Sequence, residues 1–384
     1  MSRYSVMKVL RDVNVPQLVT SCAADHTPRN IDFLWGNGEG KIGGRLARGK
    51  HTCIAGEGGL GKSTLVYDII ARITTGGQWP CNEGRAPIGN VILLSAEDDV
   101  DDIIIPKLMA AGADRNRVKI VHGVSMGPNR RRFDLQEDLR KLEDAIAEFE
   151  KVALVTIDPV SSYMGKVDSH NNTALRGVLD PISEMAERAN IAFLSVTHFN
   201  KGSGDKGIKA VNRVMGGGAF THAPRAAFAV VEDPDDTTHR LLLSLKNNLG
   251  APLQGLAYWL SVRMVGKDER TEKEIYASHV EWLPEPVKRT ANEIMGGAAS
   301  DDLTATDDAA EFLEMVLRGG FPVPVAELEQ SARDAGLLAE GQPIGQSKPF
   351  RAAAKRLGVR RRQLRGKGER HSGWLWSLSG SDAP

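Results

Sequence analysis

The residues with the clearest chemical meaning form the glycine-rich run GEGGLGKS at residues 56–63. It follows the apolar stretch HTCIAG and precedes a helical pattern over roughly 62–75, which is the context of a phosphate-binding loop. Glycines let backbone N–H groups approach phosphate oxygens, and the start of a helix adds partial positive charge. We therefore expect ATP here, with Lys62 on the β and γ phosphates and the Ser63 hydroxyl on Mg²⁺. A chance glycine-rich turn is the alternative. The residues expected to contact the nucleotide are Gly56, Glu57, Gly58, Gly59, Leu60, Gly61, Lys62, Ser63 and Thr64.

Acidic residues follow two apolar runs at the points where strands are expected to end. Asp158 closes LVTID, where a carboxylate can hold the magnesium and its water shell. Glu97 follows VILLSA and could polarise the water that attacks the γ-phosphate. Asp98 and Asp99 compete with Glu97 for that role, and an acidic turn that caps the next helix is the simpler interpretation of all three. For Asp158 the simpler interpretation is a surface residue that caps a turn.

A histidine ends a third run. His198 closes IAFLSVTH, the apolar stretch that follows the one with Asp158. A polar side chain at that position could sense the γ-phosphate and relay its presence to the loop that follows. A buried, hydrogen-bonded histidine with no such role is the alternative.

Short apolar runs alternate with helical patterns, which is typical of a parallel sheet with crossover helices. The runs occupy residues 51–56, 91–96, 118–123, 152–157 and 191–196, and helices are expected at about 62–75, 100–112, 134–150 and 174–189. Two further pairs, 226–231 with 241–246 and 256–265 with 274–283, are expected to form hairpins that extend the sheet. The predicted fold class is α/β, with a mostly parallel sheet.

The composition changes near residue 284, where Pro, Gly, Ala and Asp accumulate and predict a linker over 284–306. Helices are then expected at 307–318 (with Thr306 as N-cap), 325–335 and 348–357, followed by short strands in RRRQLRG and SGWLWSL. Three helices and a hairpin predict a winged helix over 307–378. Residues 1–45 have weak periodicity and are interpreted as a lead-in to an ATPase domain over 46–283.

Composition bears on the partners and the cellular compartment that we expect for the protein. The 384 residues contain 49 Lys and Arg against 49 Asp and Glu, so the whole chain has no bulk electrostatic preference. No apolar run is long enough to cross a membrane, and no signal peptide is recognisable. Three cysteines without a CxxC pair favour a reduced, cytoplasmic setting.

Taken together and in this order, the landmarks of residues 30–260 resemble those of RecA-like ATPases. The nearest resemblance is to the hexameric replicative helicases of plasmid RepA type. It is carried by LSAEDD, LVTIDP, SVTHFNKG, GGGAFTHAPRAAFAV and LSLKNNLGAPL. That family has LPAEDP-like, LDT-like, HHASKG-like and VSKANYGAP-like segments in the same order.

The resemblance implies a RecA-like core, a homo-hexamer and a role for four residues. Glu97 would be the catalytic base, His198 the switch residue, and Arg225 an arginine finger given in trans to the neighbouring subunit. Lys246 would be a second trans contact. Related helicases of DnaB type carry an arginine two positions after that lysine, where this chain has Asn248, so the finger role rests on Arg225 alone. A surface charge before an edge strand is the other interpretation of Arg225. The C-terminal winged helix is a further departure, because the minimal plasmid helicase lacks it.

Two basic segments are candidates for DNA contact. The loop after His198 is glycine-rich and cationic, which suits a single-stranded phosphate backbone, although a solvated loop is the alternative. Its candidate residues are Lys201, Lys206, Lys209 and Arg213. Residues 348–370 contain ten Lys or Arg against one acid and suit duplex DNA, unless the face is merely solvated. Their candidates are Arg351, Lys355, Arg356, Arg360, Arg361 and Arg362. Trp374 and Trp376 are interpreted as core of the winged helix.

These features favour an ATP-hydrolysing DNA motor, a ring-forming replicative helicase of a plasmid, phage or integrative element. Its expected partners are single-stranded and duplex DNA, further copies of itself and other replication proteins, with no membrane. Two alternatives stay open. One is a DNA-binding ATPase that loads or remodels partners without unwinding, and the other is a DNA-binding regulator in which ATP sets only the oligomeric state.

Overall fold

A computed structural model covers the whole chain and divides it into two compact units, residues 1–32 and 33–384. The residues that the structure describes are 20–38, 43–167, 172–199, 210, 219–295, 301–318, 321–339, 341–363 and 373–378. In the first unit they include a short 3-10 helix, η1 (Ala23–Asp25). In the second, a hairpin of β1 (Phe33–Gly36) and β2 (Gly44–Ala47) lies in the stretch predicted as a lead-in. This unit begins at Phe33, so the hairpin belongs to it.

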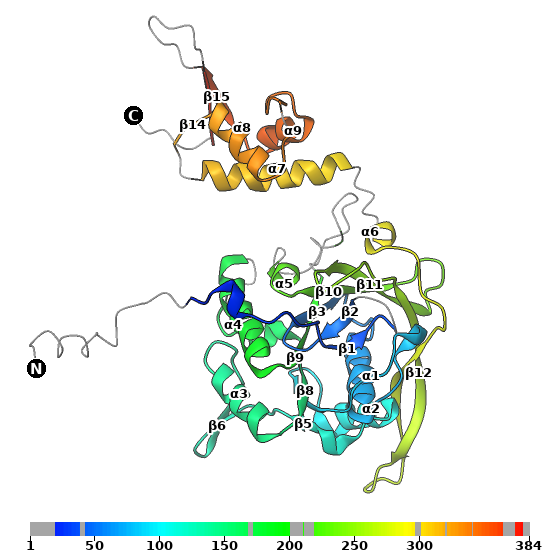
Figure 1. Cartoon of the computed structure of the whole chain (residues 1–384). Coiled ribbons are helices and arrows are strands. Elements are labelled where there is room, and N and C mark those ends of the chain that lie inside the picture. The colour runs from blue at the N-terminus through cyan, green and yellow to red at the C-terminus, as the bar shows by residue number, and fades with distance from the viewer. Residues whose placement is uncertain are drawn as a thin grey trace, which may run out of the picture. The chain divides into compact units, whose positions relative to one another are not determined.

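A nine-stranded sheet forms the centre of the larger unit, in the order β13-β12-β11-β10-β3-β9-β8-β4-β5 (Figure 1). Every neighbouring pair from β10 to β5 is parallel, and β11, β12 and β13 continue the sheet antiparallel. Its strands are β3 (His51–Gly56), β4 (Asn90–Ser95), β5 (Val118–Ile120), β8 (Val152–Asp158), β9 (Ala192–His198), β10 (Ala226–Glu232), β11 (His239–Asn247), β12 (Leu256–Lys267) and β13 (Glu274–Trp282). The predicted α/β class and both predicted hairpins agree with this sheet.

Helices cover both faces of the sheet, because successive residues of a buried strand face opposite sides. On β3, Cys53 and Ala55 pack in one apolar cluster and Ile54 in the other. The cluster with Ile54 contains residues of α1 and α2, and the other contains residues of α3, α4 and α5. These helices are α1 (Lys62–Thr75), α2 (Ile105–Ala111), α3 (Leu139–Glu148), α4 (Asn172–Ala189) and α5 (Ala219–His222).

The connections contain shorter elements. The helix expected over 100–112 begins as one π-helical stretch, η3, before α2, and the helix expected over 134–150 is shorter at both ends. These elements are η2 (Pro80–Asn82), η3 (Val100–Ile104), η4 (Arg115–Arg117), η5 (Val160–Tyr163), α6 (Ala291–Ile294) and a small hairpin of β6 (Val124–Met126) and β7 (Asn129–Arg131).

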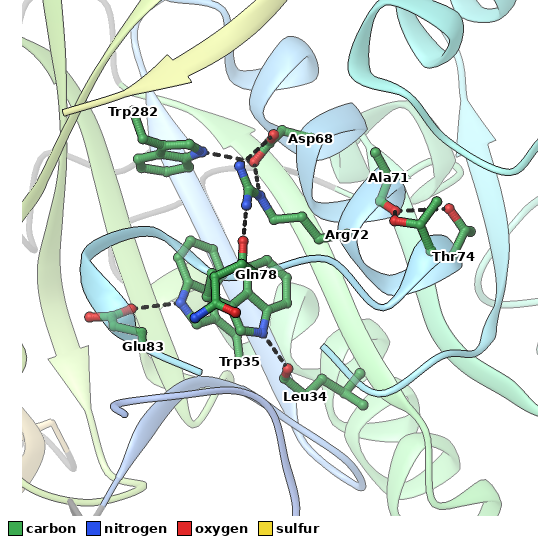
Figure 2. A network of polar contacts seen from close by, with 11 residues as sticks. Leu34, Trp35, Asp68, Ala71, Arg72, Thr74, Gln78, Glu83 and Trp282 are labelled. Carbon is green, nitrogen blue, oxygen red and sulfur yellow. Dashed lines mark hydrogen bonds and ion pairs between the residues drawn. The ribbon is translucent and has the colours of Figure 1, made fainter. Parts of the chain in front are cut away.

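A buried network of tryptophans and charges holds α1 against its surroundings (Figure 2). Asp68 on α1 accepts a hydrogen bond from Trp282 Nε1 on β13 at 2.9 Å and pairs with Arg72 one turn later at 2.7 Å. Trp282 meets the ring of Trp35 edge-on, with centroids 5.9 Å apart, and Trp35 stacks on Trp79 at 4.4 Å. The network thus ties α1, which begins at the phosphate loop, to two distant hairpins.

The centre of this network is a buried ion pair. Arg45 on β2 and Glu83 are 2% and 7% exposed and form two parallel hydrogen bonds of 2.7 and 2.8 Å. Trp35 Nε1 donates a third bond to the same carboxylate at 2.6 Å, and Arg45 also donates to the carbonyl of Gln254 at 2.8 Å. Glu83 thus accepts three hydrogen bonds, which offset the cost of burying its charge, whereas Arg45 Nη1 has no hydrogen-bond partner among the described residues.

The C-terminal part of the chain has its own apolar core, which includes Leu313, Leu328, Phe350 and Trp376. Its helices are α7 (Asp301–Leu317), α8 (Val325–Asp334) and α9 (Lys348–Arg356), and its strands are β14 (Val323–Pro324), β15 (Arg360–Gln363) and β16 (Trp374–Ser377), in the order β14-β16-β15. The rings of Phe312 and Phe350 join α7 and α9 edge-to-face at 5.8 Å.

Two sequence expectations for this part were wrong. The first helix begins at Asp301, within the stretch predicted as a linker, so Thr306 is inside the helix and is not its N-cap. Trp376 is buried as expected, but Trp374, at the end of the same strand, is 48% exposed and is not core. Among the described residues, no helix is long and apolar enough to cross a membrane.

We expect Glu83→Ala to lower the free energy of unfolding by about 3–5 kcal/mol, because it leaves the Arg45 guanidinium buried without its carboxylate. Glu187→Ala is the matched control, since it breaks a pair with Lys50 in which the Glu187 side chain is 71% exposed. That loss should stay below about 1 kcal/mol. Urea denaturation measures both values. Equal losses in the two variants would contradict the role given to the buried pair.

Candidate active site

The phosphate loop lies where the sequence predicts it, between the end of β3 at Gly56 and the start of α1 at Lys62. Two glycines are required by their surroundings. A Cβ at Gly56 would lie 2.5 Å from the carbonyl oxygen of Val230. Gly61 has φ +78°, and a Cβ there would lie 2.6 Å from Leu260. The loop therefore packs closely against β10 and β12, and this packing restrains its backbone where a phosphate would bind.

Lys62 lies at the mouth of this loop with only 5% of its surface exposed. Its ammonium donates to the carbonyl oxygen of Glu57 at 2.6 Å and lies 3.5 Å from Nδ1 of His198. Burial lowers the pKa of Lys62, while the charges of Asp158, Glu97 and Glu57 oppose that shift. The ammonium is thus held at the loop by a backbone carbonyl oxygen, with carboxylate charges nearby.

Asp158 ends β8 beside the first turn of α1. Burial raises its pKa to about 6, and a hydrogen bond with the Ser63 hydroxyl and the charge of Lys62 oppose the increase. A hydroxyl and a carboxylate side by side at a phosphate loop are the oxygen ligands that Mg²⁺ prefers. The two side chains therefore fit a magnesium ion that would bridge to the phosphates of a bound nucleotide.

The carboxylates in the acidic turn after β4 lie in different surroundings. Asp98 accepts a hydrogen bond from the Tyr67 hydroxyl at 3.0 Å and lies 3.6 Å from the Lys107 ammonium. Glu97 is exposed, and its charge affects the pKa of both Lys62 and His198. The turn is tied to the strand that ends in Asp158, because the N–H of Ala96 donates to the carbonyl of Asp158 at 3.0 Å. Asp98 is therefore occupied by protein partners, whereas Glu97 faces the site.

His198 ends β9, in register with Gly56 of the neighbouring β3. Burial lowers its pKa, the Lys62 charge adds to that decrease, and Glu97 opposes it. The imidazole is therefore neutral at neutral pH and can exchange hydrogen bonds with Lys62 and with a phosphate. The end of β9 thus connects the phosphate loop to the segment that follows residue 199.

Arg225 and Lys246 lie at the opposite edge of the sheet. Arg225 precedes β10, and its N–H donates to the carbonyl of His51, at the start of β3, at 2.9 Å. The N–H of Asn248 donates to the Arg225 carbonyl at 2.9 Å, and the Lys246 ammonium donates to the carbonyl of Pro224 at 3.0 Å. Five strand residues at about 3.3 Å each separate this edge from the phosphate loop, a distance of roughly 17 Å. Neither side chain belongs to the same cluster as Lys62.

The predicted cationic loop lies outside the described residues. Lys201, Lys206, Lys209 and Arg213 are therefore not placed, and Ala210 alone is described within residues 200–218. Ala210 is buried, and its N–H donates to the Asn292 side chain on α6 at 3.1 Å. The loop is thus connected to a helix in the segment predicted as a linker, a contact that nothing in the sequence indicates.

The C-terminal basic residues have different surroundings. Arg351 and Lys355 are exposed on α9, opposite its buried Phe350 and Ala354. Arg356 forms an ion pair with Asp307. On β15, Arg360, Arg361 and Arg362 are exposed, and Arg361 stacks over the Trp376 ring at 4.6 Å.

Sequence reasoning did not anticipate the contribution of the β12–β13 hairpin to the loop. Leu260 contacts Gly61, and the Ser278 hydroxyl lies 3.5 Å from the Thr64 hydroxyl. The hairpin itself was predicted, but its packing over α1 joins residues more than two hundred positions apart.

Comparisons with known proteins agree with an ATPase core. A family model described as an AAA domain matches residues 37–204, which is less than half of the chain. No curated protein matches. One similar solved structure is titled "ATPase Domain of G40P", at 10% identity and a TM-score of 0.42, and the match covers 55% of this chain and 82% of that one. At this identity and TM-score the likeness is not evidence of a shared activity.

Glu97→Gln should keep ATP binding and lose about 10²-fold or more in turnover, because it removes the carboxylate that can accept a proton from water. Asp98→Asn is the matched control and should lose much less, since Tyr67 and Lys107 hold Asp98 away from that role. Phosphate release and fluorescent nucleotide binding measure the two effects. A more severe loss in Asp98→Asn would assign the base to Asp98.

Proposed function

We propose that this chain is an ATP-driven DNA motor of RecA-like helicase type whose ATPase site is completed by a neighbouring subunit of a ring. The strand order β10-β3-β9-β8-β4 supports a RecA-like core, because it brings the phosphate loop, the histidine, the metal aspartate and the acidic turn to adjacent strand ends. The observation that carries the proposal is the separation of the two halves of the site. Lys62 and its carboxylates lie at one edge of the sheet, and Arg225 and Lys246 lie at the other.

The proposed hydrolysis step uses the residues around the phosphate loop. The oxygen of a water molecule bonds to the γ-phosphorus, its proton passes to the Glu97 carboxylate, and the bond from phosphorus to the β–γ bridging oxygen breaks to leave ADP. Ser63 and Asp158 would hold Mg²⁺, which neutralises charge on the β and γ phosphates when bound. Lys62 contributes one fixed cation. Charge that develops on the far side of the transferred group needs another, and an arginine finger can be worth about 10³–10⁵ in rate.

Arg225 suits that role only if it reaches another subunit. The roughly 17 Å of strand between its backbone and its own phosphate loop is too long for its side chain to span. Its backbone is nevertheless fixed by hydrogen bonds on both sides, to His51 and to Asn248. An exposed arginine whose backbone is fixed at the edge opposite its own phosphate loop is what a ring ATPase needs at the interface between subunits.

The C-terminal part supports DNA binding. Its element order, α7-β14-α8-α9-β15-β16, with β16 between the other two strands, supports the proposal of a winged helix. We propose that α9 enters duplex DNA with Arg351 and Lys355 on its exposed face, while Arg360, Arg361 and Arg362 on β15 contact the backbone. The loop containing Lys201, Lys206, Lys209 and Arg213 remains a proposed contact for single-stranded DNA.

The wider assignment is a replicative helicase of a mobile element, with a hexameric ring as the proposed assembly. An ATPase that loads or remodels partners on DNA would share the same site. A strand-displacement assay with ATP separates the two, because a loader hydrolyses ATP without releasing the displaced strand.

Arg225→Ala should keep folding and ATP binding but lose hydrolysis by at least about 10³-fold, because the cation opposite Lys62 is missing. Mixing it with Lys62→Ala should restore part of the turnover, since each variant supplies the half-site that the other lacks. Phosphate release from mixtures at fixed total concentration measures the effect. No restoration in subunits that co-assemble would mean that Arg225 does not act between subunits.

The double variant Arg351→Gln, Lys355→Gln should weaken binding to duplex DNA at all sequences and lower the salt slope of log K by about 2. Arg318→Gln, which changes an exposed residue at the end of α7, is the control and should leave the slope unchanged. Fluorescence anisotropy at several salt concentrations measures both. An unchanged slope in the double variant would mean that this face is merely solvated.

A further inference from the structure

A cavity of about 460 Å³ opens at the edge of the sheet where β3 and β10 begin. Besides Lys50, which pairs with Glu187, three cations from separate elements line it: Arg176 on α4, Arg225 before β10 and Lys246 on β11. Nothing in the sequence groups Arg176 with the other two, because it is the fifth residue of a helix with no motif around it. The fold brings it there.

The three cations are close enough to affect one another. Burial lowers the pKa of Lys246, and the charges of Arg225 and Arg176 lower it further. Like charges gathered in a half-enclosed space repel unless an anion joins them. Within the described residues, the guanidinium groups of Arg176 and Arg225 form no ion pair, so both are available to a ligand.

Carboxylates also line the cavity, and all three of them are on α4. Glu187 is engaged with Lys50 at 3.3 Å, and Glu184 lies 3.8 Å from Arg188. Asp180 is one helical turn after Arg176, and the two form no ion pair in the described structure. The two carboxylates further along α4 are therefore paired with cations, whereas Asp180 lies one helical turn from Arg176 at the cationic end.

A buried histidine forms part of the wall. His51 is 1% exposed, its Nε2 is 2.8 Å from the Ser195 hydroxyl, and burial lowers its pKa to about 3. Its Nδ1 has no hydrogen-bond partner among the described residues. A neutral polar wall next to three cations is typical of a site that holds an anion by directed hydrogen bonds as well as by charge.

We propose that Arg176 is a third trans-acting cation, which together with Arg225 and Lys246 receives the terminal phosphate of an ATP bound at the phosphate loop of a neighbouring subunit. This inference rests on the proposed ring ATPase. Arg176 moves no proton. Its guanidinium neutralises charge on the γ-phosphate oxygens while the water oxygen bonds to phosphorus and the bridging bond to ADP breaks. Because α4 directly follows the β8 and η5 segment, the cation would also connect the neighbour's phosphate to the strand that ends in Asp158.

The test compares Arg176→Gln with Arg188→Gln in the full chain. Arg188 is on the same helix, is exposed, and pairs with Glu143 and Glu184 outside the cationic end. Arg176→Gln should keep its melting temperature and ATP affinity, lose about tenfold or more in turnover, and regain part of it when mixed with Lys62→Ala. Arg176→Lys should retain more activity than Arg176→Gln. Arg188→Gln should match the unaltered protein.

Each other outcome has a distinct meaning. Normal turnover in Arg176→Gln while Arg225→Ala is impaired would overturn this inference and leave the ring ATPase standing. Normal turnover in both variants would overturn the proposed interface itself. If Arg176→Gln loses affinity for single-stranded DNA while its turnover without DNA is unchanged, the cavity binds nucleic-acid phosphate, and the assignment to ATP is wrong.

Discussion

The parallel pairing of β3 with β9, and of β9 with β8 and then β4, is the constraint on which the rest of the structure depends. Parallel strands end at the same edge of a sheet, so the residues that follow them are neighbours whatever their distance in sequence. This pairing brings Glu97, Asp158 and His198 to the same edge as Lys62, with Nδ1 of His198 3.5 Å from the ammonium. The same rule places the strand beginnings, with Arg225 among them, at the far edge. The same geometry thus brings the candidate nucleotide-binding residues together and places Arg225, the proposed trans-acting cation, at the opposite edge.

The position of the phosphate loop also depends on a rigid α1, because the loop leads directly into that helix. This helix, which begins at Lys62, is held in place through Asp68, which accepts a hydrogen bond from Trp282 and forms an ion pair with Arg72. Trp282 in turn meets Trp35, whose indole nitrogen donates to the Glu83 carboxylate that Arg45 neutralises. Fixed donors are most effective when they need not reorganise as charge develops on a phosphate. We therefore expect the buried network to keep the phosphate loop rigid, although its residues lie away from the loop.

Much of the first half could be predicted from sequence because its signals are local. GEGGLGKS lies between a strand and a helix, and Asp158, Glu97 and His198 each end an apolar run. The network could not be predicted, because Trp35 and Glu83 are 48 residues apart and Trp282 and Asp68 are 214 apart. Thr306 resembled a helix start, yet the helix begins at Asp301, since no strong breaker lies between them. Arg176 was missed because its neighbours in the cavity come from β10 and β11. The roles of all these residues in catalysis remain predictions.

The claim that the site is completed between subunits is tested most directly by measuring ATP turnover per subunit over a wide range of protein concentration, with native mass spectrometry on the same samples. Turnover per subunit should rise in step with assembly and fall to a negligible value where the protein is monomeric. Turnover that stays constant down to concentrations at which native mass spectrometry finds monomers alone would contradict the account, because a single chain would then contain every group that hydrolysis requires.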